Sequence, residues 1–247
     1  MKFVRLSTAN GITYACEKQG KFYKVEGDVF GNYAVTSQQI VGKILVPVIP
    51  SKIVALGINY RKHADEFGQA VKPEPLIFLK PPSSLIADGE SIVLPTNSGR
   101  VEHEGELAAV IGRRCKDVEA DEAKDYIFGY TCANDVSERD IQKRDGQWTR
   151  AKGFDTFCPL GYAIETELDP DCCEITVTVN GEVRQHGSTR EMVNNVYDSV
   201  SFISKVMTLE AGDVILTGTP AGVSPIRAGD VVTVTIEGVG TLTNPVK

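Results

Sequence analysis

Short runs of apolar residues, alternating or continuous, recur along the chain and predict more strands than helices. Residues 3–6 and 11–15 alternate on either side of Asn10-Gly11, a pair typical of β-hairpin turns, and residues 21–25 continue the pattern. Asn180-Gly181 predicts a second hairpin. The further strands that we expect cover residues 53–57, 76–80, 175–179, 214–216 and 231–236.

Helical periodicity is confined to three segments. A short helix over 60–67 is predicted between Asn59, a favourable N-cap residue, and Gly68. A second helix is predicted over 120–126, and a third over 190–207, where apolar residues recur on one helical face. Many short strands with few helices indicate an α+β protein that is predominantly β, and not a doubly wound sheet.

Prolines mark a boundary close to residue 48. The stretch Val46-Pro47-Val48-Ile49-Pro50 favours extended backbone, because proline biases the preceding residue away from helix. We therefore expect a small β-rich N-terminal domain over residues 1–48 and a catalytic domain over residues 49–247.

The composition excludes several classes of protein. The 247 residues are 42% hydrophobic and 24% charged, as in ordinary globular proteins. A net charge of −7 without a basic run argues against nucleic acid and anionic membranes as partners. We find no signal peptide and no apolar run of membrane-spanning length, and the six cysteines lack the spacing of a zinc or disulfide framework. These features predict a cytoplasmic protein that binds a small molecule.

Residues 101–112 carry the strongest chemical signal. As a strand, this segment places Glu102, Glu104 and Glu106 on one face, and its second half is apolar on both faces, which predicts burial. Buried neighbouring carboxylates repel one another unless a cation lies between them. Oxygen ligands suit Mg²⁺, Mn²⁺ or Ca²⁺ better than Zn²⁺. A solvated acidic edge strand explains this segment equally well.

Three other candidates are weaker when each is taken alone. Asp135 follows the apolar run 127–130, but an aspartate there is more typical of a cap or turn than of a metal ligand. Lys152 has unusually apolar neighbours for a surface lysine. His63 and Glu66 share a face of the first predicted helix, where a surface contact is the simpler explanation.

Four motifs together resemble the fumarylacetoacetate hydrolase (FAH) superfamily. Residues 103–112 resemble its Glu-x-Glu-Leu metal motif, and residues 134–142 its third-ligand motif. Residues 148–157 are similar to its Ala-Lys-x-Phe-Asp segment, and residues 216–223 to its Thr-Gly-Thr-Pro-x-Gly-Val loop. The resemblance is to the short bacterial members of acylpyruvase, oxaloacetate decarboxylase or hydroxyheptadienedioate isomerase type. It implies a rolled mixed β-sheet and a homodimer.

The resemblance also implies roles for individual residues. A divalent cation, Mg²⁺ or else Mn²⁺ or Ca²⁺, would be held by Glu104, Glu106 and Asp135. The implied catalytic residues are His63, Glu66 and Lys152, the first two activating water and the third lying beside the metal and the substrate carboxylate. The implied substrate-binding residues are Gln142, Thr219, Gly218 and Arg139.

The implied activity is metal-dependent hydrolysis of a C–C bond in an acylpyruvate or related 2-oxo or diketo acid, through an enolate that the cation stabilises. Two alternatives share this chemistry, namely isomerisation of 2-hydroxyhepta-2,4-diene-1,7-dioate or 5-carboxymethyl-2-hydroxymuconate in aromatic compound catabolism, and decarboxylation of oxaloacetate. A non-catalytic metal-binding module is disfavoured because every ligand and Lys152 are present. A calcium-stabilised structural domain is disfavoured because the chain has no Asp-x-Asp-x-Asp-Gly loop.

Overall fold

The computed structural model describes residues 1–72 and 74–247, and strands dominate it. One mixed sheet has the strand order β4-β3-β2-β1-β14-β11-β10-β17-β6-β7, with β5 added beside β1. Its strands are β1 Lys2–Thr8, β2 Gly11–Lys18, β3 Lys21–Gly27, β4 Tyr33–Ile40, β5 Lys43–Ile44, β6 Ile53–Gly57, β7 Leu76–Lys80, β10 Gly105–Ile111, β11 Ile127–Asn134, β14 Ala163–Glu165 and β17 Val214–Leu216.

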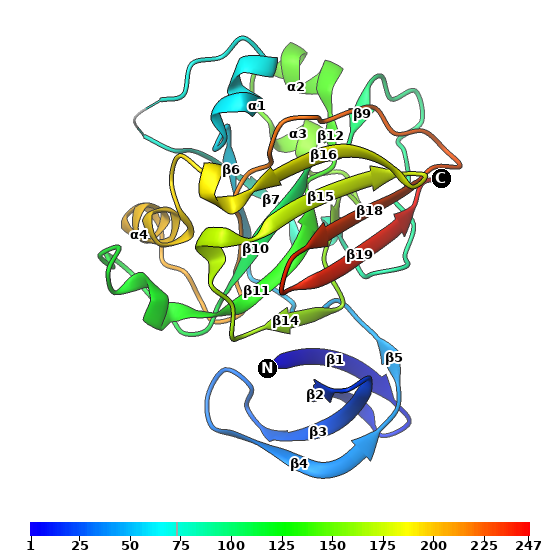
Figure 1. The fold of residues 1–247 in the computed structure, drawn as a ribbon, viewed down its shortest axis with the longest axis vertical. Coiled ribbons are helices and arrows are strands. Elements are labelled where there is room, and N and C mark those ends of the chain that lie inside the picture. The colour runs from blue at the N-terminus through cyan, green and yellow to red at the C-terminus, as the bar shows by residue number, and fades with distance from the viewer. Residues whose placement is uncertain (73) are drawn as a thin grey trace.

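A second, antiparallel sheet has the order β16-β15-β18-β19 and lies in front of β10 and β11 in Figure 1. Its strands are β15 Glu174–Val179, β16 Glu182–Ser188, β18 Val231–Ile236 and β19 Gly240–Pro245. The two sheets meet closely at Gly105, where a Cβ atom would lie 2.3 Å from Val177 Cγ2. The remaining strands form two short two-stranded sheets. One pairs β9 Val101–Glu102 with β12 Ser137–Glu138, and the other pairs β8 Leu85–Ile86 with β13 Cys158–Pro159.

The predicted fold class is confirmed, since the protein is α+β, mostly β, with a large mixed sheet. Strands β1–β5 lie below the main body in Figure 1. They join the large sheet through β1, which pairs with β14 so that Phe3 stands opposite Ile164. Phe3 also packs against Phe128, with ring centroids 5.4 Å apart. The proposed boundary at residue 48 stays a prediction.

Four α-helices occur in the described residues, and none is long and apolar enough to cross a membrane. They are α1 Arg61–Glu66, α2 Arg139–Asp145, α3 Thr149–Lys152 and α4 Val196–Val206. The first predicted helix is confirmed within a residue or two, but Tyr60 and not Asn59 is its N-cap. The side chain of Asn59 instead donates to the carbonyl oxygens of Asn194 and Thr217, so it joins separate loops.

The other helix predictions need correction. The segment 120–126 forms only a 3₁₀ turn, Ala123–Tyr126. The third helix is shorter than predicted, because Asn195 caps α4 by accepting from Asp198 N–H. Helices α2 and α3 were not predicted, since the α2 sequence has no buried residue and hence no apolar face to recognise.

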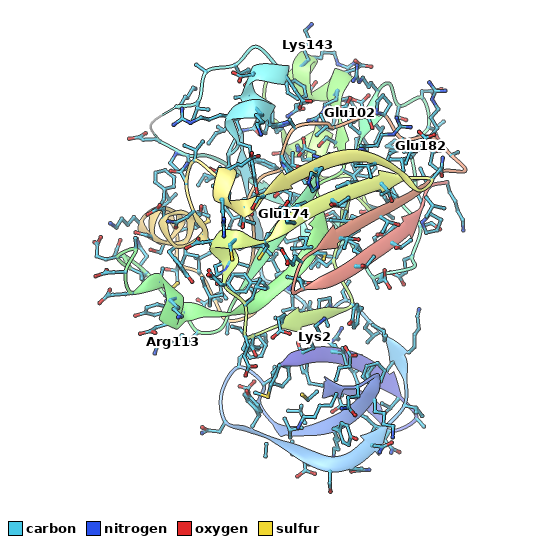
Figure 2. All side chains as sticks on the ribbon, in the orientation of Figure 1. Lys2, Glu102, Arg113, Lys143, Glu174 and Glu182 are labelled. Carbon is cyan, nitrogen blue, oxygen red and sulfur yellow. The ribbon has the colours of Figure 1, made fainter. Side chains whose placement is uncertain are left out.

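Both predicted hairpins form. The loop between β1 and β2 is Ala9-Asn10, one residue earlier than expected, because Thr8 pairs with Gly11. The loop between β15 and β16 is Asn180-Gly181, whose φ angles of 53° and 81° suit a tight hairpin turn. Most charged side chains point outward, as Arg113, Glu174 and Glu182 do in Figure 2, whereas Glu102 is buried.

Candidate active site

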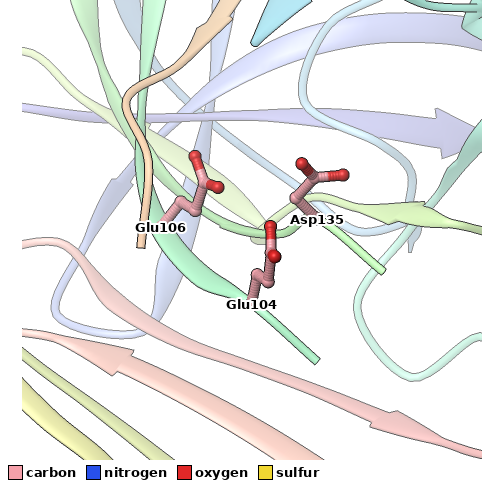
Figure 3. A group of neighbouring side chains, drawn as sticks. All are labelled: Glu104, Glu106 and Asp135. Atoms are coloured by element: carbon pink, nitrogen blue, oxygen red, sulfur yellow. The ribbon is translucent and has the colours of Figure 1, made fainter. Parts of the chain in front are cut away.

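Antiparallel pairing of β10 with β11 brings the three carboxylates together. Gly105 stands opposite Asn134 in this ladder, so Glu104 and Asp135 meet at its end, where Asp135 N–H donates to Glu104 O at 2.8 Å. Glu106 follows two residues later on the same face. All three side chains are buried, and Figure 3 shows their carboxylates facing a common space. One oxygen from each lies within 4.8 Å of the others.

The segment that carries the glutamates is not one continuous strand, as the sequence had suggested. It breaks at His103 and Glu104, between β9 and β10. At this break Glu104 N–H donates to the side-chain Oδ1 of Asn134 on β11 in place of a backbone carbonyl. Glu102 is not part of the convergent group of carboxylates, and its Oε2 accepts from Arg139 Nε at 2.6 Å.

Two buried lysines and the partly buried Arg139 surround two of the carboxylates. Lys152 Nζ lies 2.7 Å from Glu104 Oε2 and 2.7 Å from Asp135 Oδ2. Arg139 Nη2 lies 2.5 Å from Glu104 Oε1, and Lys80 Nζ lies 2.5 Å from Asp135 Oδ1. Sequence reasoning missed Lys80; its only signal is a charged residue at the end of the apolar run 76–80.

Glu106 has a different environment. Its Oε2 accepts from Gly218 N–H at 2.6 Å, and no side chain in residues 1–72 or 74–247 forms an ion pair with it. Burial raises the pKa of Glu106 well above its usual value, and the charges of Asp135 and Glu104 raise it further. Among the described residues, the cationic side chains therefore face Glu104 and Asp135, and none pairs with Glu106.

The neighbouring groups are held in their charged forms. Burial alone would raise the pKa of Glu104, but Arg139 and Lys152 outweigh burial and hold it far below its usual value. Burial alone would lower the pKa of Lys152, but the charges of Asp135 and Glu104 raise it above its usual value. A divalent cation would place positive charge beside Glu106, and three carboxylate oxygens form a suitable donor set for a hard ion.

A cavity of about 420 Å³ opens beside the carboxylates and is large enough for a small acid. The predicted site residues in its lining are His63, Glu104, Glu106, Arg139, Gln142, Lys152 and Thr219. Asp135 and Gly218 lie behind this lining, bonded to Lys152 and Glu106, whereas the exposed Glu66 contacts His63 and the loop at Gly222. The structure thus brings the sequence-predicted residues into one region of the molecule.

His63 and Glu66 come from α1, which follows directly after β6. His63 Nδ1 lies 3.2 Å from Glu66 Oε2, while Glu66 Oε1 accepts from Gly222 N–H at 2.7 Å. With Nδ1 directed at the carboxylate, Nε2 is the nitrogen left to exchange a proton with a molecule in the cavity. The Phe67 ring packs edge-on against the imidazole, with centroids 5.0 Å apart.

Two polar groups of the cavity have defined orientations. Arg139 Nη1 donates to Gln142 Oε1 at 2.9 Å, so the Gln142 NH₂ group remains available to another acceptor. The Thr219 hydroxyl donates to Gly105 O at 2.8 Å. Both contacts fix side chains that line the cavity by bonding them to the segments that carry the carboxylates.

Sequence reasoning missed the apolar side of the cavity. It includes Trp148, the single tryptophan, whose ring packs so closely on β6 that a Cβ atom at Gly57 would lie 2.4 Å from it. Ile58 lines the same side with φ +59°, which a β-branched residue rarely adopts. Such backbone strain is found most often at functional sites.

Comparison with known proteins places this site in a family. Residues 52–247 match the family described as "Fumarylacetoacetate (FAA) hydrolase C-terminal". The chain belongs to the fumarylacetoacetate hydrolase superfamily. A solved structure titled 5-carboxymethyl-2-hydroxymuconate delta-isomerase, from Mycobacterium smegmatis, is 46% identical with a TM-score of 0.93, covering 100% of this chain and 99% of that one.

Curated relatives carry other names within the same superfamily. Oxaloacetate tautomerase FAHD1 of Arabidopsis thaliana is 46% identical over 76% of this chain and 87% of the relative. Oxaloacetate decarboxylase of Dictyostelium discoideum is 42% identical over 77% of this chain and 90% of the relative. The protein is therefore an enzyme of this superfamily, within the range of hydrolase, isomerase and decarboxylase.

Proposed function

We propose that the protein is a divalent-metal-dependent hydrolase that cleaves a C–C bond of an acylpyruvate or a related 2-oxo or diketo acid. The observation that carries this proposal is that one cavity is lined by two of the three clustered carboxylates, by Lys152 and by His63 of the His63–Glu66 pair. A water-activating base and a cation site beside the same small-molecule cavity are what such a hydrolysis needs.

In this proposal Glu104, Glu106 and Asp135 hold Mg²⁺, with Mn²⁺ as the next choice, because their oxygens converge and Glu106 lacks a cationic partner. When bound, the cation supplies Lewis-acid stabilisation of the negative charge that develops on the 2-oxo group.

Lys152 binds the substrate carboxylate. Its ammonium group has three N–H bonds, and the contacts with Glu104 and Asp135 occupy two of them. The third is available to an acid in the cavity that Lys152 lines. Gln142 contributes its free NH₂ group, oriented by Arg139, and Thr219 completes the substrate contacts, with Gly218 shaping the loop.

His63 acts as the general base. Glu66 accepts a hydrogen bond from Nδ1–H, so Nε2 takes a proton from water, and the water oxygen attacks the distal carbonyl carbon of the substrate. The bond between that carbon and C3 then breaks, and its electron pair forms the enolate of pyruvate. The proton on His63 is delivered to C3, which yields pyruvate and a carboxylic acid.

Oxaloacetate decarboxylation and diene isomerisation are the second candidates, because similar proteins carry those names. Neither reaction consumes water, so neither requires His63 to generate a nucleophile. Activity that survives loss of His63 would favour them. We also propose that the protein is a homodimer, which light scattering coupled to size-exclusion chromatography would test.

Metal-stripped protein should be incubated with Mg²⁺ or Mn²⁺ and with acetylpyruvate, oxaloacetate or a hydroxymuconate-type diene acid, following the enol or diene absorbance. Glu106→Ala should abolish metal-dependent turnover, and His63→Ala should abolish hydrolysis of acetylpyruvate. Glu182→Ala, which removes an exposed carboxylate on β16, is the matched control and should behave like the wild type. Tight metal binding with no turnover of any of these acids would refute the proposed substrate class.

A further inference from the structure

A buried set of hydrogen bonds joins the second sheet to the cavity lining. Its centre is Gln185 on β16, whose side chain is fully buried. Gln185 Nε2 donates to Thr219 Oγ1 at 2.7 Å and to Pro220 O at 2.6 Å. Gln185 Oε1 lies 3.1 Å from Gly105 N and 2.9 Å from His103 Nδ1. The amide thus uses all four of its hydrogen-bonding positions.

The chemistry of these partners fixes the direction of each bond. The Pro220 carbonyl can only accept and the Gly105 N–H can only donate, so the Gln185 amide has one possible orientation. His103 must then carry its proton on Nδ1. In the neutral ring, His103 Nε2 accepts from the Ser224 hydroxyl at 2.9 Å.

The two ends of this network lie at the active site. Gly105 stands between Glu104 and Glu106 in sequence, and Thr219 lines the cavity. Thr219 accepts from Gln185 and donates to Gly105 O, so its hydroxyl proton is already committed. Gln185 itself is not part of the cavity lining, and so it acts through other residues.

Close packing keeps β16 against the loop that bears Thr219. A Cβ atom at Gly222 would lie 2.2 Å from Arg184 O, and one at Gly187 would lie 2.7 Å from Pro220 Cβ. These distances are too short for any side chain without backbone movement. The glycines therefore let the loop approach until the Gln185 amide reaches both the loop and β10.

We propose that Gln185 is a positioning residue of the active site, which holds Thr219 in its place in the cavity lining and anchors Gly105, while His103 holds the Gln185 amide in the required orientation. The expected effect on substrate binding rests on the proposed function, because it takes Thr219 as a substrate contact. The effect on the geometry of the site does not depend on it.

The test compares Gln185→Met, Thr219→Val and the double variant in acetylpyruvate hydrolysis at saturating Mg²⁺. Methionine matches glutamine in length and removes every bond of the amide. Each single variant should raise KM about tenfold and change kcat less than about threefold, which corresponds to ~1.4 kcal/mol in binding. The KM of the double variant should also rise about tenfold, because both changes remove the same contact. A rise of about a hundredfold would mean that the two changes act independently and would refute the positioning role.

Two further variants separate positioning from folding. Thr189→Val removes a buried hydroxyl that accepts from Cys173 N–H near the end of β16, so it should lower the melting temperature and leave KM unchanged. Ser224→Ala removes only the outermost bond and should raise KM about twofold to threefold, which keeps the test open if Gln185→Met does not fold. An unchanged KM in Ser224→Ala would then refute the proposal.

A crystal structure of Gln185→Met, or of Ser224→Ala if needed, gives a readout that is independent of turnover. We expect the Thr219 hydroxyl to leave its position 2.8 Å from Gly105 O, and an unmoved Thr219 would overturn the proposal. If the wild type hydrolyses none of the 2-oxo acids while Thr219 moves in the variant, the proposed function fails and the positioning role stands.

Discussion

Glu104 and Glu106 lie two residues apart on the same face, yet replacing each with glutamine should have opposite effects on the metal-free protein. Glu104 is paired with Arg139 and Lys152, whereas Glu106 accepts only the Gly218 N–H bond. Glutamine keeps the size of glutamate and can still accept that bond. Glu106→Gln therefore removes a carboxyl that must either carry a buried charge without a cation or bind a proton on folding, whereas Glu104→Gln deprives Arg139 and Lys152 of one anionic partner.

The magnitudes follow from the cost of burying charge. At pH 7, keeping a buried carboxyl protonated costs up to about 4 kcal/mol, because each unit of pKa shift is worth about 1.4 kcal/mol, so glutamine should stabilise the protein by about 1–4 kcal/mol. Removing one partner of a buried charge pair costs about 2–5 kcal/mol. In a chain of 247 residues, 1 kcal/mol shifts the melting temperature by roughly 2–4 °C. We expect Glu106→Gln to melt about 2–16 °C above the wild type in the absence of metal, and Glu104→Gln about 4–20 °C below it.

Scanning calorimetry of the wild type and the two variants, in EDTA and in excess Mg²⁺, measures both changes in melting temperature. Metal at a hundred times its dissociation constant should stabilise the wild type by about 2.7 kcal/mol. Neither variant should gain this increment, so the lead of Glu106→Gln over the wild type should shrink or reverse when Mg²⁺ is present. If both variants shift the melting temperature in the same direction in EDTA, the unequal ion pairing that we describe is wrong.

Three other predictions concern catalysis, packing and pH. His63→Ala should lower kcat for acetylpyruvate by about 10²–10⁴ and leave Mg²⁺ affinity, measured by titration calorimetry, unchanged. Gly57→Ala places a Cβ atom 2.4 Å from the Trp148 ring and should destabilise the protein by about 1–3 kcal/mol in urea unfolding while raising KM. Burial alone would raise the pKa of Asp213, but hydrogen bonds from backbone N–H groups and from Lys52 outweigh it and lower the pKa. A carboxylate with a lowered pKa stabilises the fold at any pH above its unfolded-state pKa of about 3.9, and this stabilisation is lost as the pH falls through its folded-state pKa. Asp213→Asn should therefore cost about 1.5–3 kcal/mol at pH 7 and progressively less below pH 4.

Hydrophobic periodicity predicted the strands and helices that depend mainly on residues close together in the sequence. The strands over 53–57, 76–80 and 231–236 form with the predicted bounds, because each is a short apolar run with clear ends. The helix predicted over 120–126 failed because acidic residues at its start favoured a helix that has no apolar face to bury. The resemblance supplied the family and the candidate site residues. Their roles, and the domain boundary at residue 48, stay predictions.

Alternation in a strand explains why Glu104 and Glu106 share a face, but it says nothing about which of them meets a cation. That difference arises because α2 and α3 place Arg139 and Lys152 on the Glu104 side, while the loop after β17 offers Glu106 a single backbone N–H. Gln185 could not be predicted for the same reason. It lies on a strand with ordinary alternation, and its amide gains a role only because the second sheet packs on Gly105. Charged residues that face a ligand form motifs that can be found in the sequence. Residues that hold those charged side chains in place are recognised only from the tertiary packing. In the described residues of this enzyme, Glu104 has cationic partners whereas Glu106 has a backbone N–H alone. This difference destabilises the metal-free cluster at Glu106 and favours a cation at that position.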